Sequence, residues 1–192
     1  MGLDYLPISW RQYHTLTQKL AATVLSQDKP IDEIVAISRG GLTLGHLLSD
    51  FLRIPISTII IQSYTDIQTR GEITITGKLQ RSIRGKHILL VDDVSDTGAT
   101  YKRAVAYLRH CRPKTILTVA MFYKPHSQFR PDIFARATKK WIIFPYEPTE
   151  MSLLIAKKME NQGKTKREIQ RFLEELGFNE KQIAFVRKHY VS

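Results

Sequence analysis

Four runs of apolar, mostly branched residues recur along the first 122 residues of the chain. The runs are Ile34–Ile37, Ile56–Ile61, Ile88–Val91 and about Thr115–Phe122. A strand that is apolar without alternation is buried on both faces, and such strands occur almost only in parallel sheets that helices cover on each side. We therefore predict an α/β fold with a mainly parallel, twisted sheet flanked by helices. In sheets of this kind, ligands bind beyond the carboxyl ends of the strands.

The segments between these runs have the spacing of amphipathic helices. Ser9 and Gln12 form a capping box, and apolar residues then recur every three or four positions, which predicts a helix over Trp10–Leu25. Leucines with helical spacing indicate a second helix over Leu42–Phe51, and a third is expected just after Thr100.

The character of the chain changes after residue 147. There, Thr165 and Glu168 form another capping box, and Gly177 separates the helix that follows it from a second one. We expect a main domain over residues 1–147 and a C-terminal helical extension of two helices over residues 148–192.

The composition bounds the class of protein. The 192 residues suffice for one domain with a small appendage, and 29 Lys and Arg against 18 Asp and Glu give a net charge of +11. Of that excess, residues 148–192 carry nine basic and six acidic residues, so most of it belongs to the main domain. A single cysteine, Cys111, no charged-then-apolar leader at the start of the chain and no apolar run of about 18 residues lead us to expect a cytoplasmic protein without a membrane partner.

The third apolar run leads without a gap into an acidic, small-residue turn, Asp92-Asp93-Val94-Ser95-Asp96-Thr97-Gly98-Ala99-Thr100. The last four residues lack bulk at a predicted helix start, so their amides and two hydroxyls can surround a phosphate group. The carboxylates of Asp92 and Asp93 can accept hydrogen bonds from ribose hydroxyls or hold a hydrated magnesium ion. An acidic surface turn or the carboxylates of a nucleotide hydrolase are the alternatives, although the Walker-type loop is absent.

This segment resembles the signature of the type I phosphoribosyltransferases, which bind 5-phosphoribosyl 1-pyrophosphate (PRPP). The resemblance implies the type I phosphoribosyltransferase fold. It also implies that Asp92 and Asp93 bind the ribose hydroxyls, that Asp96 handles the proton on purine N7, and that Thr97, Gly98, Ala99 and Thr100 hold the 5′-phosphate.

Two further segments fit the same resemblance. Ser38-Arg39-Gly40-Gly41 follows the first run, where two glycines permit close approach of an anion and Arg39 offers donors to it. It resembles the family's pyrophosphate loop, for which a cis peptide bond is expected between Ser38 and Arg39. The polar stretch of about residues 63–86 occupies the place of the family's flexible hood, whose expected contacts are Tyr64 and Arg70, the latter with a catalytic role.

The base-binding residues are expected near the last strands. Lys124 is a permanent donor, which suits the O6 acceptor of guanine, xanthine or hypoxanthine and disfavours adenine. Trp141 offers a stacking plane, and the backbone of Trp141 and Ile142 can face the far edge of the base. These residues resemble the xanthine-guanine branch of the family, although Ile143 stands where bacterial members often have an acidic residue. Glu147 fills the family's acidic position and is expected, with Asp92 and Asp93, near a magnesium ion.

These patterns predict an enzyme that transfers the phosphoribosyl group of PRPP to N9 of a 6-oxopurine and releases pyrophosphate, with Mg²⁺ as cofactor. A homo-oligomer, dimer or tetramer, is expected. A PRPP-sensing, nucleic-acid-binding regulator on the same fold is the alternative. Because acidic residues alternate with the basic ones in the C-terminal helices, as on a solvated helix face, nucleic acid is not expected as a partner.

Overall fold

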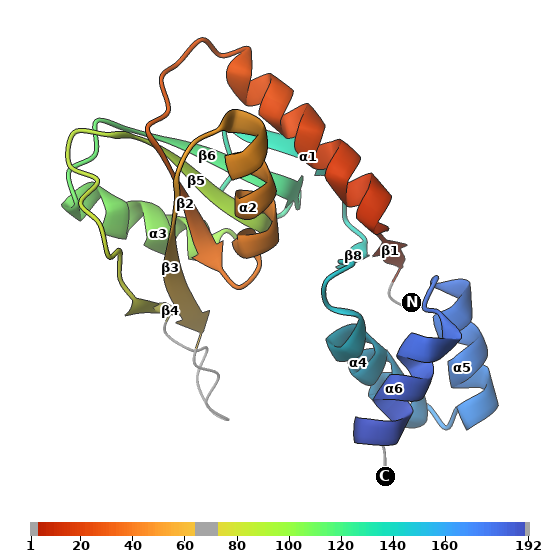
Figure 1. The fold of residues 1–192 in the computed structure, drawn as a ribbon. Coiled ribbons are helices and arrows are strands. Elements are labelled where there is room, and N and C mark those ends of the chain that lie inside the picture. The colour runs from red at the N-terminus through yellow and green to blue at the C-terminus, as the bar shows by residue number, and fades with distance from the viewer. Residues whose placement is uncertain (1–3, 64–72, 191–192) are drawn as a thin grey trace. The chain divides into compact units, whose positions relative to one another are not determined.

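The computed structural model describes residues 4–63 and 73–190 (Figure 1). The chain forms two compact units. One runs from His14 to Lys139, and the other combines the residues up to Tyr13 with those from Lys140 onward. The predicted division at residue 147 is a different boundary, and whether residues 1–147 fold without the remainder stays a prediction.

The unit from His14 to Lys139 contains a six-stranded sheet in the order β4-β3-β2-β5-β6-β7. The strands are β2 (Glu33–Ser38), β3 (Ile56–Ser63), β4 (Ile73–Gly77), β5 (His87–Ser95), β6 (Thr115–Tyr123) and β7 (Ile133–Ala137). All neighbouring pairs are parallel except β3 and β4. The predicted α/β class with a mainly parallel sheet is therefore confirmed.

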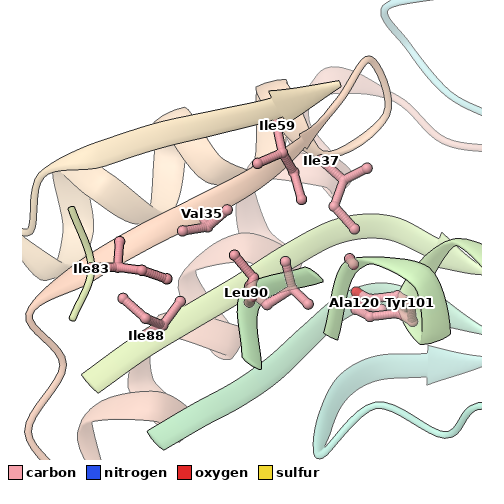
Figure 2. Close-up of a cluster of buried hydrophobic side chains, with 10 residues drawn as sticks. Val35, Ile37, Ile59, Ile83, Ile88, Leu90, Tyr101 and Ala120 are labelled. Carbon is pink, nitrogen blue, oxygen red and sulfur yellow. The ribbon is translucent and has the colours of Figure 1, made fainter. Parts of the chain in front are cut away.

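Helices cover both faces of this sheet. Helix α3 (Ala99–His110) packs its Tyr101, Ala104 and Leu108 against one face, where the alternate side chains of β2 and β5 join the same buried cluster (Figure 2). Helix α2 (Gly41–Leu52) packs on the other face, because a Cβ at Gly45 would lie 2.8 Å from the Cβ of Ala36. Burial on both faces explains why the strands are apolar without alternation.

The four predicted strands are confirmed, and each extends beyond the predicted bounds by one residue or more. Strand β5 was expected to end at Val91 but continues to Ser95, because Asp92 pairs with Ala120 and Ser95 with Tyr123 on β6. The acidic pair therefore lies within the last part of a strand. The short strand β7 was not predicted from the sequence. Only one of its five residues is buried, two are partly buried and two are exposed, so it lacks the continuous apolar run of the four predicted strands.

The other unit contains a two-stranded parallel sheet and three C-terminal helices. Strand β1 (Tyr5–Pro7) pairs with β8 (Trp141–Ile143), and the helices are α4 (Pro148–Glu160), α5 (Lys166–Glu175) and α6 (Glu180–Tyr190). The prediction of two helices was wrong, because α4 begins at Pro148 and buries only Met151, Ser152 and Ile155. Such a sparse apolar stripe gives a weak periodic signal.

Helix α1 (Trp10–Leu25) has the predicted bounds, and both capping boxes are present. The backbone amide of Gln12 donates to the Ser9 hydroxyl, and the side-chain oxygen of Gln12 accepts the backbone amide of Ser9. Thr165 and Glu168 exchange equivalent hydrogen bonds. In the part of the chain that the structure describes, no helix is long and apolar enough to cross a lipid bilayer.

Candidate functional site

The loop after β2 turns sharply into α2. The peptide bond between Ser38 and Arg39 is cis, as predicted from the sequence. Gly40 has helical dihedral angles, φ −53° and ψ −47°, and Arg39 is exposed. The loop therefore presents Arg39 outward at the carboxyl end of β2.

The two glycines of this loop lie directly against β5. A Cβ at Gly40 would stand 2.5 Å from Oδ2 of Asp93, and a Cβ at Gly41 would stand 2.4 Å from the backbone oxygen of Val91. Real Cβ atoms do not approach other atoms so closely, so a side chain at either position would displace a neighbouring group. The sequence prediction that both loops meet at one edge of the sheet is confirmed.

The acidic pair occupies this junction. Asp92 is buried, at 7% exposure, and Asp93 is half-buried. Burial, and then repulsion from the Asp93 carboxylate, raise the pKa of Asp92 well above its ordinary value, while backbone N–H groups of Asp93 and Gly41 oppose that rise. Two crowded carboxylates, of which Asp92 has a raised pKa, form a site that a cation or hydroxyl donors would stabilise.

The turn after β5 has the small residues that a bound anion requires. Gly98 has φ +83°, a conformation that favours glycine, and it precedes the first turn of α3 without a side-chain cap. The Thr97 hydroxyl accepts the Ala99 amide at 3.3 Å. Asp96 and Thr97 are exposed, so the turn faces solvent at the start of the helix.

A third loop, residues 124–129, is bonded to this turn. A Cβ at Gly98 would lie 2.5 Å from the amide nitrogen of Phe129, and the Phe129 ring stacks on Tyr101 at a centroid distance of 5.0 Å. Four hydrogen bonds join the two loops: Lys124 N to Ser95 O, Gln128 N to Thr97 O, Ser95 Oγ to Ser127 Oγ, and Ser95 Oγ to Phe129 O. These bonds hold the third loop beside the turn that contains Gly98.

This third loop brings two nitrogen-bearing side chains toward Asp96. Lys124 is buried at 7% exposure, and burial lowers the pKa of its ammonium while the charge of Asp96 opposes the shift. His126 lies with Nε2 3.3 Å from Oδ1 of Asp96. The sequence analysis overlooked His126, although its position two residues after Lys124 could have suggested it.

The remaining predicted base-binding residues lie in the other compact unit. Trp141 is 46% exposed and Ile142 is buried, and both belong to β8. The amide of Trp141 donates to Asp4 O at 2.8 Å, so this group is engaged within its own sheet. Glu147 ends the following turn, where its carboxylate accepts the Phe144 amide at 3.3 Å. Their role around a base remains a prediction.

Tyr64, Arg70 and the expected metal ligands are the remaining predicted site residues. Tyr64 and Arg70 lie outside the described residues. Among the residues that are described, no three His, Cys, Asp or Glu side chains gather as a metal site, so the expected trio of Asp92, Asp93 and Glu147 remains a prediction. Mg²⁺ in phosphate-binding sites usually takes only one or two carboxylates besides water and substrate oxygens. The paired aspartates fit that requirement.

Comparison with known proteins agrees with this geometry. The family model described as "Phosphoribosyl transferase domain" matches residues 9–153. The chain belongs to this family. The phosphoribosyltransferase is 31% identical over 143 residues to a xanthine-guanine phosphoribosyltransferase of Idiomarina loihiensis, covering 73% of this chain and 85% of that one.

Solved structures show the same fold. The crystal structure of a purine phosphoribosyltransferase from Pyrococcus horikoshii superposes on this phosphoribosyltransferase with a TM-score of 0.69 and 29% identity, over 76% of this chain and 95% of that one. A xanthine-guanine-hypoxanthine phosphoribosyltransferase of Helicobacter pylori gives 0.67 at 20% identity, over 79% and 98%. The predicted type I phosphoribosyltransferase fold is confirmed, and the protein is an enzyme of this class.

Proposed function

We propose that this enzyme transfers the 5-phosphoribosyl group of PRPP to N9 of a 6-oxopurine and releases pyrophosphate. The observation that carries the proposal is the junction of three loops at one edge of the sheet, residues 38–41, 92–100 and 124–129. The first loop places two glycines against the carboxylate pair of the second, and the third adds a buried ammonium. The relatives named above act on purines, and the junction supplies groups for each part of such a reaction.

The sugar phosphate is proposed to bind between the second loop and the first. The small residues Thr97–Thr100 at the start of α3 offer amides and hydroxyls to the 5′-phosphate. Asp92 and Asp93 accept the ribose hydroxyls, which are donors that relieve the repulsion between the two carboxylates. Arg39, exposed at the first loop, offers its guanidinium to the departing pyrophosphate.

The proton is proposed to move to Asp96. As N9 attacks the anomeric carbon and the bond to pyrophosphate breaks, the base loses a proton from N7, and the exposed Asp96 carboxylate accepts it. Bound Mg²⁺, held by Asp92 and Asp93, would supply charge neutralisation for the pyrophosphate oxygens. The chain itself holds the carboxylates, the Arg39 guanidinium and the Lys124 ammonium at one edge of the sheet.

The preference for a 6-oxopurine follows from Lys124. Its ammonium is buried, and burial lowers the pKa of the group, so an acceptor atom on the base would stabilise the charged form. The O6 atom of guanine, xanthine or hypoxanthine is an acceptor, whereas the amino group of adenine is a donor. Lys124 therefore favours the oxo bases, and the choice among the three lies with the far edge of the base.

The test is pyrophosphate release with PRPP, Mg²⁺ and each of guanine, xanthine, hypoxanthine, adenine and orotate. Release with at least one oxo purine, and none with adenine or orotate, is expected. A Lys124→Met variant should lose about 10- to 150-fold in kcat/KM for the oxo purines, the value of a hydrogen bond to a charged group.

The matched control is Lys19→Met. Lys19 is exposed on α1 and belongs to none of the three loops, so its loss should leave the rate unchanged. Absence of pyrophosphate release from the wild-type enzyme with every base would refute the proposal. Equal losses in the two variants would refute the role of Lys124 alone.

A further inference from the structure

A strongly basic surface lies away from the proposed site, in the same compact unit. Residues 77–91 contain four Lys or Arg, residues 97–131 contain seven, and neither segment contains an Asp or Glu. The excess of basic over acidic residues is therefore concentrated in these two segments. The fold brings these segments together.

Three backbone contacts align the two segments. Leu79 N donates to the Tyr107 hydroxyl at 3.0 Å, Gly85 N to Arg112 O at 2.9 Å, and Lys114 N to Lys86 O at 2.8 Å. The segment that joins β4 to β5 therefore runs beside the second half of α3 and the turn that follows it (Figure 1). Ile83 and Leu79 enter the same apolar cluster as Leu108, so the apolar side chains of both segments point inward.

Nine of the eleven cations in the two segments are exposed. Six of the nine belong to the aligned stretches 78–84 and 109–114, and we call these the basic face: Lys78, Arg81, Arg84, Arg109, Arg112 and Lys114. The Glu33 carboxylate beside Lys86 is already paired with that lysine. Burial opposes its charge, but hydrogen bonds from Lys86 and Ser57, with the charges of Lys86 and Arg81, hold its pKa below the ordinary value.

The basic face is distinct from the proposed catalytic edge. Lys86 and Lys114 immediately precede the amino ends of β5 and β6, whereas the acidic pair and Lys124 lie at the carboxyl ends of the same two parallel strands. Strand β5 alone is nine residues long, about 30 Å at the usual rise. PRPP bound at one edge therefore does not explain cations gathered at the other.

The chemistry of the face indicates which polyanion it fits. Four of its six members are arginines, whose planar guanidinium groups bind phosphate oxygens in a bidentate way. The large apolar side chains that are exposed among the described residues come from other segments. An anionic membrane would require apolar side chains for insertion, and a protein partner usually requires an apolar or aromatic centre. Phosphodiester backbones require neither.

We propose that the basic face binds the phosphodiester backbone of nucleic acid, independently of base sequence. If six phosphates are contacted, the logarithm of the affinity for duplex DNA should fall with the logarithm of salt concentration at a slope of about −5. Between about 50 and 200 mM salt this amounts to a loss of roughly a thousandfold. DNA and RNA share the chemistry, and the experiment separates them.

The experiment measures fluorescence anisotropy of labelled duplex DNA, single-stranded DNA and single-stranded RNA across a salt series. The face variant is Arg81→Gln, Arg84→Gln, Arg112→Gln, and the control is Lys157→Gln, Lys181→Gln, Lys188→Gln, which removes three exposed charges from α4 and α6. Both variants have the same net charge. The face variant should weaken binding at least tenfold and flatten the salt slope by about three, and the control should do neither.

Equal weakening by the two variants would show that binding follows net charge and would overturn the proposal. Tighter binding to phosphatidylserine vesicles or to polyglutamate than to every nucleic acid would overturn the assigned partner. Circular dichroism of each variant verifies folding, and phosphoribosyl transfer by both should equal that of the wild type. Since binding is measured without substrates, it can succeed or fail independently of the proposed reaction.

Discussion

Gly40 and Gly41 are adjacent and both exclude a side chain, yet replacing them should have different consequences. At Gly40 the backbone is helical, a conformation that alanine adopts without strain, and the three atoms nearest to the Cβ would be those of the Asp93 carboxylate at 2.5–2.6 Å. A side chain can rotate away. At Gly41 the Cβ would meet the backbone oxygen of Val91 at 2.4 Å and the Cα of Asp92 at 3.1 Å, and a central strand cannot rotate away.

Gly40→Ala should therefore move the Asp93 carboxylate by about 1 Å to restore an ordinary contact distance. That displacement removes its hydrogen bonds to substrate, each worth about 1.5 to 3 kcal/mol for a charged group, so kcat/KM for PRPP should fall about 10- to 150-fold. The unfolding free energy should change by less than about 1 kcal/mol. Gly41→Ala should instead cost about 1 to 3 kcal/mol of stability through strain in the β5 backbone.

Steady-state kinetics with varied PRPP and urea denaturation of both variants provide the test. Gly163→Ala is a control, because a Cβ there meets nothing within 4 Å, so only the positive φ opposes it and kinetics should be unaffected. A Gly40→Ala enzyme with wild-type kcat/KM would refute the role of Asp93 at the substrate. A Gly41→Ala enzyme as stable as Gly40→Ala would refute the rigidity of the junction.

Three further changes test other parts of the site and fold. Asp96→Asn should retain PRPP binding and lower kcat about 100- to 10,000-fold, measured by initial rates and by binding titration. Because the pKa of Asp92 is raised in the folded state, its contribution to stability is greatest below its ordinary value of 3.8 and is lost as the pH rises through the folded pKa. Asp92→Asn should therefore raise the denaturation midpoint at pH 7 and weaken PRPP binding, and a lowered midpoint would contradict this. The pKa of Glu33 is lowered, so its contribution is present above pH 4.5 and is lost as the pH falls through the folded pKa. Glu33→Gln should cost about 1 to 3 kcal/mol at pH 7, discounted because the Lys86 side chain is 38% exposed, and should show no penalty at pH 2 in urea titrations.

Local signals in the sequence predicted the elements that position the site. The apolar runs at Ile34–Ile37 and Ile88–Val91 predicted two central strands, because burial on both faces forces an uninterrupted pattern. The glycine pair after β2 and the turn around Gly98 predicted the loops, since close backbone approach and a positive φ both require glycine.

Contacts between distant segments could not be predicted in this way. The bond between Asp96 and His126 joins residues 30 apart in the chain, and nothing near either one specifies the other. Strand β4 shows an alternation too short to separate from a loop, and α4 buries too few residues for a clear helical period. The basic face likewise depends on two segments that only the tertiary structure aligns.

The bonding between the turn at Ser95–Thr97 and the loop that begins at Lys124 has a consequence for substrate size. Strands β5 and β6 pair in register up to Ser95 and Tyr123, so the backbone fixes the span from the proposed phosphate cradle to the Cα of Lys124 and limits the reach of its side chain. A nucleotide analogue lengthened between its sugar and its base should therefore engage one end or the other, never both. Substitutions of side chains in either loop should change which groups are recognised while leaving the accepted length unaltered.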